Sequence, residues 1–197
     1  MWCIEVVDSR SISLASIVQP LSLASGHCTY VQGAYANKIT ATFPGQQAVD
    51  VGPNDIYASP EYIVTGAGDH DYGLILRLPG TSDDGFGWWA ILPDEELNNR
   101  IVTNCGYPGD KPWGTMWITG GSISNYTANR IYYMNDTMAG QSGSPVYTWC
   151  GGYWTVLAVH SYAYGGCPNS APRFTTEMIS RFLEQIWMDW RKNRWGQ

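Results

Sequence analysis

The sequence predicts an all-β protein with one helix, placed at its C-terminal end. Short runs rich in Thr, Val, Ile and Tyr alternate with clusters of Gly, Pro, Asn and Asp, as they do in antiparallel barrels and sandwiches. The chain has 197 residues, 22 of them glycine, and only 14% are charged, which is typical of a globular protein rich in turns. At this length it can form one large domain or two small halves that share an interface.

The first half is expected to consist of strands joined by tight turns. A modestly apolar run from 12 to 30 predicts one or two strands, followed by a turn at Gly26-His27-Cys28. Further strands are expected at residues 38–43, 61–65 and 72–78 because Gly- and Pro-rich clusters bound these runs.

The second half repeats this pattern after a polar link at 81–96. Strands are expected at residues 100–103, 115–118, 131–133, 146–149 and 154–160. The one helical pattern covers residues 177–190, where Met178, Phe182, Ile186 and Trp190 recur at steps of four and Thr175 or Thr176 can cap the helix. We therefore divide the chain into residues 1–90, 91–176 and 177–197.

Composition excludes several functional classes. The formal charge is −6 and the basic residues cluster only at 191–194, so we expect no nucleic-acid partner. No run of about 18 apolar residues occurs, so no membrane span and no membrane partner are predicted. No metal site or cofactor is expected, because the acidic pair Asp83-Asp84 is more typical of a solvated surface than of a calcium loop.

Cysteines and sequons favour secretion. The five cysteines lack CxxC spacing, so disulfides are a better prediction than zinc, although the odd count leaves one thiol over. N-glycosylation triplets begin at Asn125 and Asn135. Residues 1–8 do not have the pattern of a signal peptide, so a secreted protein would have its leader outside this sequence.

The strongest signal of chemistry is the run Gly140-Gln141-Ser142-Gly143-Ser144-Pro145-Val146. A catalytic serine needs a base to take its proton and donors to hold the oxyanion that forms. The glycines allow a sharp turn, in which the N–H groups of Gly140 and Ser142 can form an oxyanion hole. A Gly/Ser turn before a strand would produce the same pattern without any chemistry.

A base and a carboxylate can be assigned in the first half. As a neutral imidazole, His27 can act as the general base towards Ser142, although a lone loop histidine is more often a surface residue. Asp71 precedes a buried-looking strand and can orient the imidazole. Asp69 and His70 are rival candidates, which we interpret as solvated residues of a Gly-rich loop.

Taken together, these residues resemble the chymotrypsin-fold serine proteases, and within them the glutamyl endopeptidase (V8-like) branch. The motifs that carry the resemblance are Gly26-His27-Cys28, Asp71-Tyr72-Gly73-Leu74-Ile75, Gly106-Tyr107-Pro108-Gly109-Asp110-Lys111, Asp136-Thr137, the Ser142 run, and Leu157-Ala158-Val159-His160-Ser161 followed by Tyr164-Gly165-Gly166. The resemblance covers most of the chain from about residue 20 to 190. The resemblance implies two antiparallel six-stranded β-barrels, a cleft between them, and a closing C-terminal helix.

The resemblance also implies the role of each site residue. His27 would be the general base and later the acid, Asp71 its orienting partner and Ser142 the nucleophile, with Gly140 and Ser142 supplying the oxyanion donors. Gln141 stands where trypsin-like enzymes have an Asp that pairs with the freed N-terminal amine, so that means of activation is not expected.

The N-terminal segment departs from the family pattern. The family has more chain before the histidine, so we expect a truncated or misassembled N-terminus and an incomplete first barrel. For the disulfides, the resemblance suggests Cys150–Cys167 and, with less support, Cys3–Cys28, which leaves Cys105 free.

Two signals compete over specificity. Asp136 occupies the position at which trypsin-type enzymes bind Arg or Lys. In the glutamyl branch, a histidine at the position of His160 and a hydroxyl at the position of Thr137 contact a substrate carboxylate. An imidazole and a hydroxyl can both donate hydrogen bonds to such a group. Ser161, next to His160, is expected to contribute to substrate binding. His160 could also be a satisfied core histidine at a strand end.

We expect a secreted, monomeric serine endopeptidase that acts on polypeptides and cleaves after Glu, then Asp. The alternatives are a catalytically silent or misassembled homologue that acts at most as a binding module, and a trypsin-like enzyme that uses Asp136.

Overall fold

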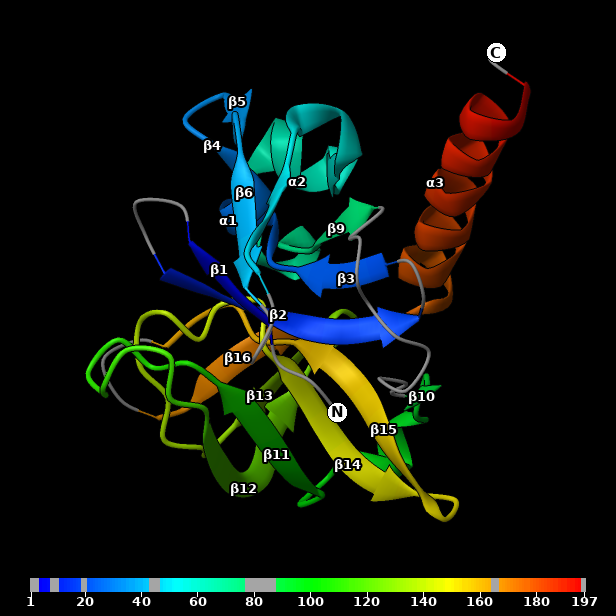
Figure 1. Cartoon of the computed structure of the whole chain (residues 1–197). Coiled ribbons are helices and arrows are strands. Elements are labelled where there is room, and N and C mark those ends of the chain that lie inside the picture. Colours follow the sequence, from blue (N-terminus) through cyan, green and yellow to red (C-terminus); the bar gives the residue numbers. More distant parts are fainter. Residues whose placement is uncertain are drawn as a thin grey trace.

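Two curled β-sheets and a C-terminal helix make up the computed structural model, which describes residues 4–7, 11–18, 21–42, 47–76, 88–163 and 167–195. The sheets lie one above the other in Figure 1, and each is formed by one half of the chain. Four features named from the sequence lie outside the described residues: Cys3, the end of the 72–78 run, the Asp83-Asp84 pair and the 164–166 segment.

The first sheet has seven described strands in the order β7-β6-β1-β2-β3-β9-β8. They are β1 (Ile4–Val7), β2 (Ser11–Val18), β3 (Leu21–Ala24), β6 (Ile39–Thr42), β7 (Val49–Val51), β8 (Ile56–Ala58) and β9 (Gly73–Leu76), and a separate hairpin joins β4 (Tyr30–Val31) to β5 (Ala34–Tyr35). All neighbours in the sheet are antiparallel. The N-terminal segment, from which we expected missing strands, supplies β1 and β2 to the middle of the sheet.

The second sheet also has seven described strands, in the order β10-β15-β14-β11-β12-β13-β16. They are β10 (Trp88–Trp89), β11 (Ile101–Gly106), β12 (Trp117–Tyr126), β13 (Arg130–Tyr133), β14 (Pro145–Cys150), β15 (Tyr153–Val159) and β16 (Asn169–Pro172). The resemblance implied six strands in each barrel. Here the two-residue β10 adds an edge strand that runs parallel to β15, whereas the other pairs are antiparallel.

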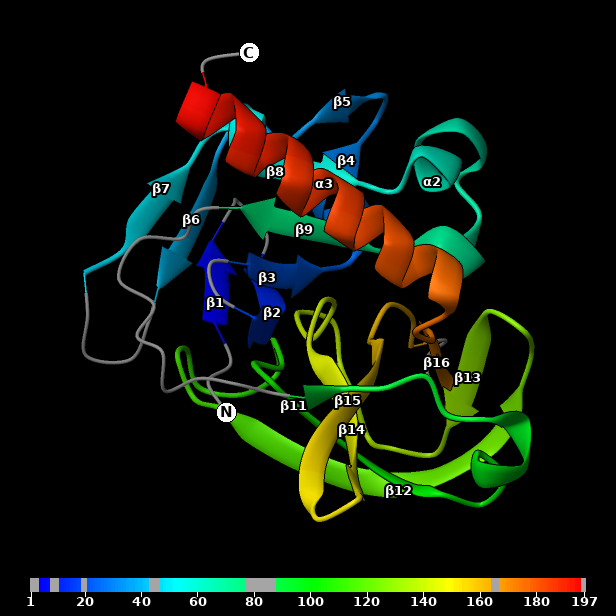
Figure 2. The same cartoon turned by 90° about the vertical axis from the view of Figure 1, so that its right-hand side faces the viewer.

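The long helix α3 (Thr176–Trp195) confirms the helical pattern at the C-terminal end. Its first turn is capped by Thr175, whose hydroxyl accepts a hydrogen bond from the N–H of Met178 over 3.2 Å. Met178 and Phe182 are buried, as the stripe predicts. Towards the C-terminal end of the helix the apolar stripe is exposed, since Trp190 is 41% exposed. In Figure 2 the helix crosses in front of the first sheet.

Shorter helical turns occur where no helical pattern is present in the sequence. They are α1 (Gly26–Thr29), α2 (Pro60–Thr65), η1 (Pro53–Asp55), η2 (Gly68–His70) and η3 (Asp94–Glu96). The prediction of a strand at 61–65 is therefore wrong. Ser59 caps α2 by accepting from the N–H of Tyr62, and Pro60 occupies the first helical position, where its ring and missing N–H are tolerated.

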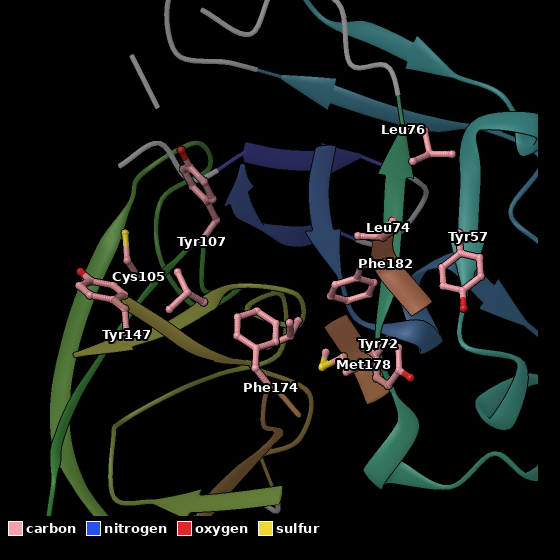
Figure 3. Close-up of a cluster of buried hydrophobic side chains, with 12 residues drawn as sticks. Tyr57, Tyr72, Leu74, Leu76, Cys105, Tyr107, Tyr147, Phe174, Met178 and Phe182 are labelled. Atoms are coloured by element: carbon pink, nitrogen blue, oxygen red, sulfur yellow. The ribbon is translucent and has the colours of Figure 1, made fainter. Parts of the chain in front are cut away.

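A shared hydrophobic core holds the two halves together (Figure 3). Tyr72 and Leu74 from the first half, Phe174 from the second and Phe182 from α3 all belong to this cluster. The rings of Tyr72 and Phe182 meet edge to face, with centroids 5.5 Å apart. Because Tyr72 directly follows Asp71, this core fixes the position of Asp71 relative to the second half.

The cysteines do not pair as expected. Cys28, Cys150 and Cys167 are free thiols, so the expected Cys150–Cys167 bridge is wrong, and Cys28 is not bridged either. Cys105 is a buried member of the core between the halves. None of the helices in the described part of the chain is long and apolar enough to cross a membrane.

Candidate active site

His27 and Asp71 form a close pair where β3 ends and β9 begins. The His27 Nδ1 lies 2.7 Å from Oδ2 of Asp71, and the backbone N–H of His27 donates to Oδ1 over 2.7 Å. Asp71 is fully buried, whereas the His27 side chain is 32% exposed. Both Asp71 oxygens therefore bind His27, and the imidazole is held with Nδ1 towards the carboxylate. This orientation leaves Nε2 for a reacting group.

Glycine at position 26 makes this close approach possible. A Cβ at Gly26 would lie 2.9 Å from Cδ1 of Tyr62 and 3.0 Å from Oδ1 of Asp71, distances that a side chain cannot occupy without a shift. Gly26 also begins the single turn α1, which carries His27. The sequence motif Gly26-His27 is therefore explained by packing against Asp71.

Ser142 lies in a tight turn between β13 and β14. Its neighbour Gln141 is buried: the side-chain oxygen accepts from the N–H of Met138 over 2.8 Å, and Nε2 donates to Asn104 over 3.2 Å. The N–H of Ser144 closes the turn by donating to the carbonyl of Gln141 over 3.0 Å. In place of an ion pair at position 141, an amide network thus fixes the turn, while Ser142 remains partly exposed.

Gly140 precedes this turn with φ at +99°, a backbone conformation that favours glycine. A Cβ there would meet the carbonyl oxygen of Tyr107 at 2.9 Å. The turn that would carry the oxyanion donors therefore requires glycine at position 140.

One carbonyl oxygen brings the His27 and Ser142 segments to the same place. The carbonyl of His160 accepts from the hydroxyl of Ser25 over 2.7 Å and from the N–H of Gly143 over 2.7 Å. Ser25 lies two residues before His27, and Gly143 directly follows Ser142. No hydrogen bond between the side chains of His27 and Ser142 is found in the described residues, which is common before substrate tightens such a site.

Ser161 extends this junction to Asp71. Its hydroxyl donates to the carbonyl oxygen of Asp71 over 3.1 Å, across 90 positions of sequence. The segment after β15 therefore contacts the turns that carry all three predicted catalytic residues. Ser161 has a structural role here in addition to the substrate contact predicted from sequence.

The His160 side chain is buried and hydrogen-bonded through Nδ1 to the hydroxyl of Tyr133. Burial, with the nearby His27, lowers the pKa of His160 from 6.5 to about 3, so the imidazole is neutral at ordinary pH. Burial also raises the pKa of Tyr133 well above 10, so its hydroxyl keeps its proton and donates to Nδ1. The His160 proton is then on Nε2, which makes that atom a donor.

Thr137 and Asp136 lie in different surroundings. The Thr137 hydroxyl is buried and has no hydrogen-bond partner in the described part of the chain. Asp136 is exposed and lines a cavity of about 190 Å³ together with Asp110, Lys111 and Trp117. The neutral His160 is not among the residues that line this cavity.

The pKa of His27 reflects opposing effects. Burial by itself lowers it, but the adjacent Cys28 and the hydrogen-bonded Asp71 raise it more, and the net shift is upward from 6.5. Protonated His27 is thus favoured near neutral pH, and a base role requires the fraction that has lost this proton. Among the described residues, no group of three His, Cys, Asp or Glu side chains is arranged to hold a metal ion.

Sequence reasoning missed four residues that support the site. Ser25 and Tyr133 hydrogen-bond to His160, as described above. Tyr162 packs on His27, with centroids 5.8 Å apart, and Arg130 forms an ion pair with Asp69. Only Ser25 had a local signal, its position directly before the Gly26-His27 motif, since the others are joined to the site by contacts between the two halves.

Comparisons with known proteins give relatives but no match to a protein-family model. A glutamyl endopeptidase of Bacillus licheniformis is 34% identical over 180 residues, which cover 83% of this chain and 56% of the relative. An extracellular metalloprotease of Bacillus subtilis is 29% identical over 84% of this chain and 54% of its own. A glutamyl endopeptidase of Staphylococcus aureus strain MW2 is 30% identical over 73% of this chain and 44% of its own. The chain spans about half the length of the curated relatives it matches.

Solved structures agree with this fold. A Glu endopeptidase structure matches with a TM-score of 0.78 over 92% of this chain and 89% of its own, at 23% identity. A thermostable serine protease from an extremophilic microorganism matches with a TM-score of 0.72 over 91% and 93% of the two chains, at 17% identity. At these identities the likeness establishes the two-sheet, chymotrypsin-like fold.

Proposed function

Because the chain belongs to the glutamyl endopeptidase family, we propose that it is a serine endopeptidase that hydrolyses peptide bonds through an acyl-enzyme. The observation that carries the proposal is the junction at His160, whose carbonyl is bonded to the segments before His27 and after Ser142. Around it lie an imidazole oriented by a buried carboxylate, a partly exposed serine and a tight glycine turn. This combination is what acyl transfer requires.

The hydrogen bonds support a role for each residue. Neutral His27 would take the Ser142 proton through Nε2 as the hydroxyl attacks the scissile carbonyl, and would pass it to the leaving amine. Asp71 would hold Nδ1–H and stabilise the imidazolium without taking its proton. The N–H groups of Gly140 and Ser142 would bind the oxyanion. Water, activated by His27, would then release the acyl group.

For the substrate, we favour Glu before the scissile bond, with Asp second. Two groups support this preference: the Nε2–H of His160, set as a donor by Tyr133, and the buried hydroxyl of Thr137, which has no hydrogen-bond partner among the described residues. Both can donate to a carboxylate, and hydrogen bonds to an ionised acceptor are the strong ones. The exposed position of Asp136, in a cavity that His160 does not line, argues against trypsin-like use of that carboxylate.

We also propose that the protein acts outside the cell as a monomer on polypeptides. The name of the Bacillus subtilis relative, an extracellular protease, supports the location. The silent-homologue alternative is disfavoured by the intact His27–Asp71 geometry, since a site that had lost its chemistry would not need a buried carboxylate held by two hydrogen bonds of 2.7 Å.

A fluorophosphonate probe tests the proposed chemistry. The purified protein should be labelled at one site, and peptide mapping should place the label on Ser142. The Ser142→Ala and His27→Ala variants should not be labelled. An unlabelled folded wild type would favour the silent homologue.

Specificity is tested separately with matched peptides that carry Glu, Asp, Gln, Arg or Lys before the scissile bond. Glu peptides should be cleaved fastest and Asp peptides second. Faster cleavage of Arg or Lys peptides would contradict the proposed specificity and favour the role of Asp136.

A further inference from the structure

The guanidinium of Arg130 links the two halves of the protein next to the loop that carries Asp71. Arg130 begins β13 and is only 4% exposed. Its Nε donates to the Asp69 carboxylate over 2.9 Å, and its Nη1 donates to the Ser170 hydroxyl over 2.7 Å. Asp69 lies in η2, two residues before Asp71, whereas Ser170 lies in β16 of the second sheet. One side chain therefore connects the loop that carries Asp71 to the sheet that leads into the Ser142 turn.

Tyr162 extends this connection to His27. The Arg130 guanidinium lies 5.2 Å from the centroid of the Tyr162 ring, and the His27 ring is 5.8 Å from the same centroid. Burial together with the nearby charge of Asp71 raises the pKa of Tyr162, so the hydroxyl stays protonated beside that carboxylate. A cation is attracted to the negative face of an aromatic ring. A shift of Arg130 would thus be transmitted to both members of the pair.

Gly68 provides the space that the guanidinium occupies. A Cβ at position 68 would lie 2.4 Å from Nη2 of Arg130 and 3.0 Å from Cε2 of Tyr162. This Nη2 is buried and has no hydrogen-bond partner among the residues described. A buried donor left unsatisfied is destabilising, so this ion pair is a poor source of stability and its main contribution is a fixed geometry.

We propose that Arg130 is a positioning residue for catalysis: through Asp69 and Tyr162 it holds the loop of Asp71 where Asp71 can orient His27. The inference rests on the proposed serine endopeptidase function. It also revises the sequence-based interpretation of Asp69 as a merely solvated loop residue, because its carboxylate, although 46% exposed, is bound to a buried cation of the other half.

The central experiment replaces the guanidinium by an apolar side chain in Arg130→Met. The half-exposed Asp69 can be solvated in this variant, so no buried carboxylate is left unpaired. We expect kcat to fall about ten- to hundredfold with KM nearly unchanged, because the substitution misplaces the reacting groups and does not alter the substrate contacts. Fluorophosphonate labelling of Ser142 should slow in proportion. The Arg130→Lys variant should recover part of kcat, since it keeps the charge but cannot bind Asp69 and Ser170 with one planar fork.

Arg173 provides the matched control. It is also a buried arginine of the second half, and its Nη1 forms a 2.7 Å ion pair with Asp94 in that same half. Arg173→Met should lower the melting temperature as much as Arg130→Met or more, yet leave kcat within about twofold. Equal losses of kcat in both variants would overturn the proposal, since the effect would then be one of general stability.

Asp69→Asn tests the same contact from the exposed side; because it removes the counter-charge of the buried guanidinium, its melting temperature is measured alongside its activity. It should lower kcat in the same way as Arg130→Met, and the double variant should be no worse than Arg130→Met alone, because the two residues act through one contact. Additive losses, or an unchanged kcat in Asp69→Asn, would refute the positioning role.

Proton NMR separates this inference from the proposed activity. A hydrogen-bonded His27 Nδ1 proton gives a resonance far downfield in a folded protein, whether or not the protein is active. That signal should broaden or shift in Arg130→Met and Asp69→Asn and persist in Arg173→Met. An inactive wild type would end the proposed function alone, whereas a signal that none of these substitutions alters would end the positioning role alone.

Discussion

The hydroxyl of Ser25 donates a hydrogen bond of 2.7 Å to the carbonyl oxygen of His160, across 135 positions of sequence. Because that carbonyl also accepts from the N–H of Gly143, the first half is fixed to the turn that carries Ser142. A conventional catalytic triad requires its hydroxyl and imidazole to be set within a fraction of an ångström. Under the proposed mechanism, Ser25 is therefore a structural residue on which the chemistry depends.

We predict that Ser25→Ala lowers kcat about three- to tenfold and stability by about 1 kcal/mol. The stability loss is small because the His160 carbonyl retains its bond from Gly143. Steady-state kinetics and thermal melting check both values. Ser22→Ala is the matched control: Ser22 is equally buried in the neighbouring strand, and its hydroxyl has no partner in the described chain. An activity loss in Ser22→Ala as large as in Ser25→Ala would contradict this interpretation.

Substitution of Gly26 is predicted to separate His27 from Asp71. In Gly26→Ala the new methyl group would lie 3.0 Å from Oδ1 of Asp71 and 2.9 Å from the Tyr62 ring, so α1 or Tyr62 must shift. We expect a destabilisation of about 1–3 kcal/mol and a fall in kcat of about 10²-fold. Chemical denaturation and kinetics measure the two effects. Gly52→Ala, with no atom within 4 Å of its new Cβ, should leave both unchanged, and an active Gly26→Ala enzyme would contradict the packing argument.

The general fold could be predicted from the sequence because its signals are local. Turn clusters and β-rich runs locate most strands, and the four-residue stripe from Met178 locates α3. The strand expected at 61–65 failed because the capping pair Ser59-Pro60 outweighed the β-propensity of Tyr62, Ile63 and Val64. The Cys150–Cys167 pairing that the resemblance suggested is wrong, because disulfide connectivity cannot be deduced from sequence alone.

For the candidate site, the sequence motifs indicate which residues are candidates for catalysis but not which residues hold them in place. His27, Asp71 and Ser142 stand in short patterns whose chemistry is recognisable along the chain. Arg130 and Tyr162 act across the junction between the halves, so no local pattern distinguishes them from any buried arginine or core tyrosine. Their identification required the hydrogen bonds and ring contacts of the folded chain.

The pH dependence of activity is predicted from His27. Burial lowers the pKa of His27, but Cys28 and Asp71 raise it by more than burial lowers it. The pKa in the folded protein therefore lies above 6.5. Only the neutral imidazole can act as base, so kcat/KM should rise with pH, with the midpoint of its acid limb above 6.5. A profile measured from pH 5 to 10 on a Glu peptide tests this. His70→Gln should keep the midpoint, whereas a wild-type midpoint at or below 6.5 would show that Asp71 and Cys28 do not control His27.

The same shift predicts how His27 affects stability. Because its folded pKa is raised, the stability contributed by the protonated His27–Asp71 pair is fully present below about pH 6.5 and is lost as pH rises through the folded value. The difference in melting temperature between wild type and His27→Ala should therefore shrink as pH increases. A difference that grows with pH would contradict the sign of the shift.

Tyr133 is predicted to control specificity through His160. In Tyr133→Phe the donor to Nδ1 is lost, so the buried imidazole is no longer held with its proton on Nε2, towards the proposed substrate carboxylate. The ratio of kcat/KM for Glu over Gln peptides should fall about tenfold, and stability by about 1–3 kcal/mol, because a buried acceptor is left unsatisfied. Tyr132→Phe, in the adjacent and less buried position, is the control and should keep the ratio. If Tyr133→Phe also keeps the full Glu preference, His160 does not read the substrate carboxylate through a fixed tautomer, and the contact must be assigned to Thr137.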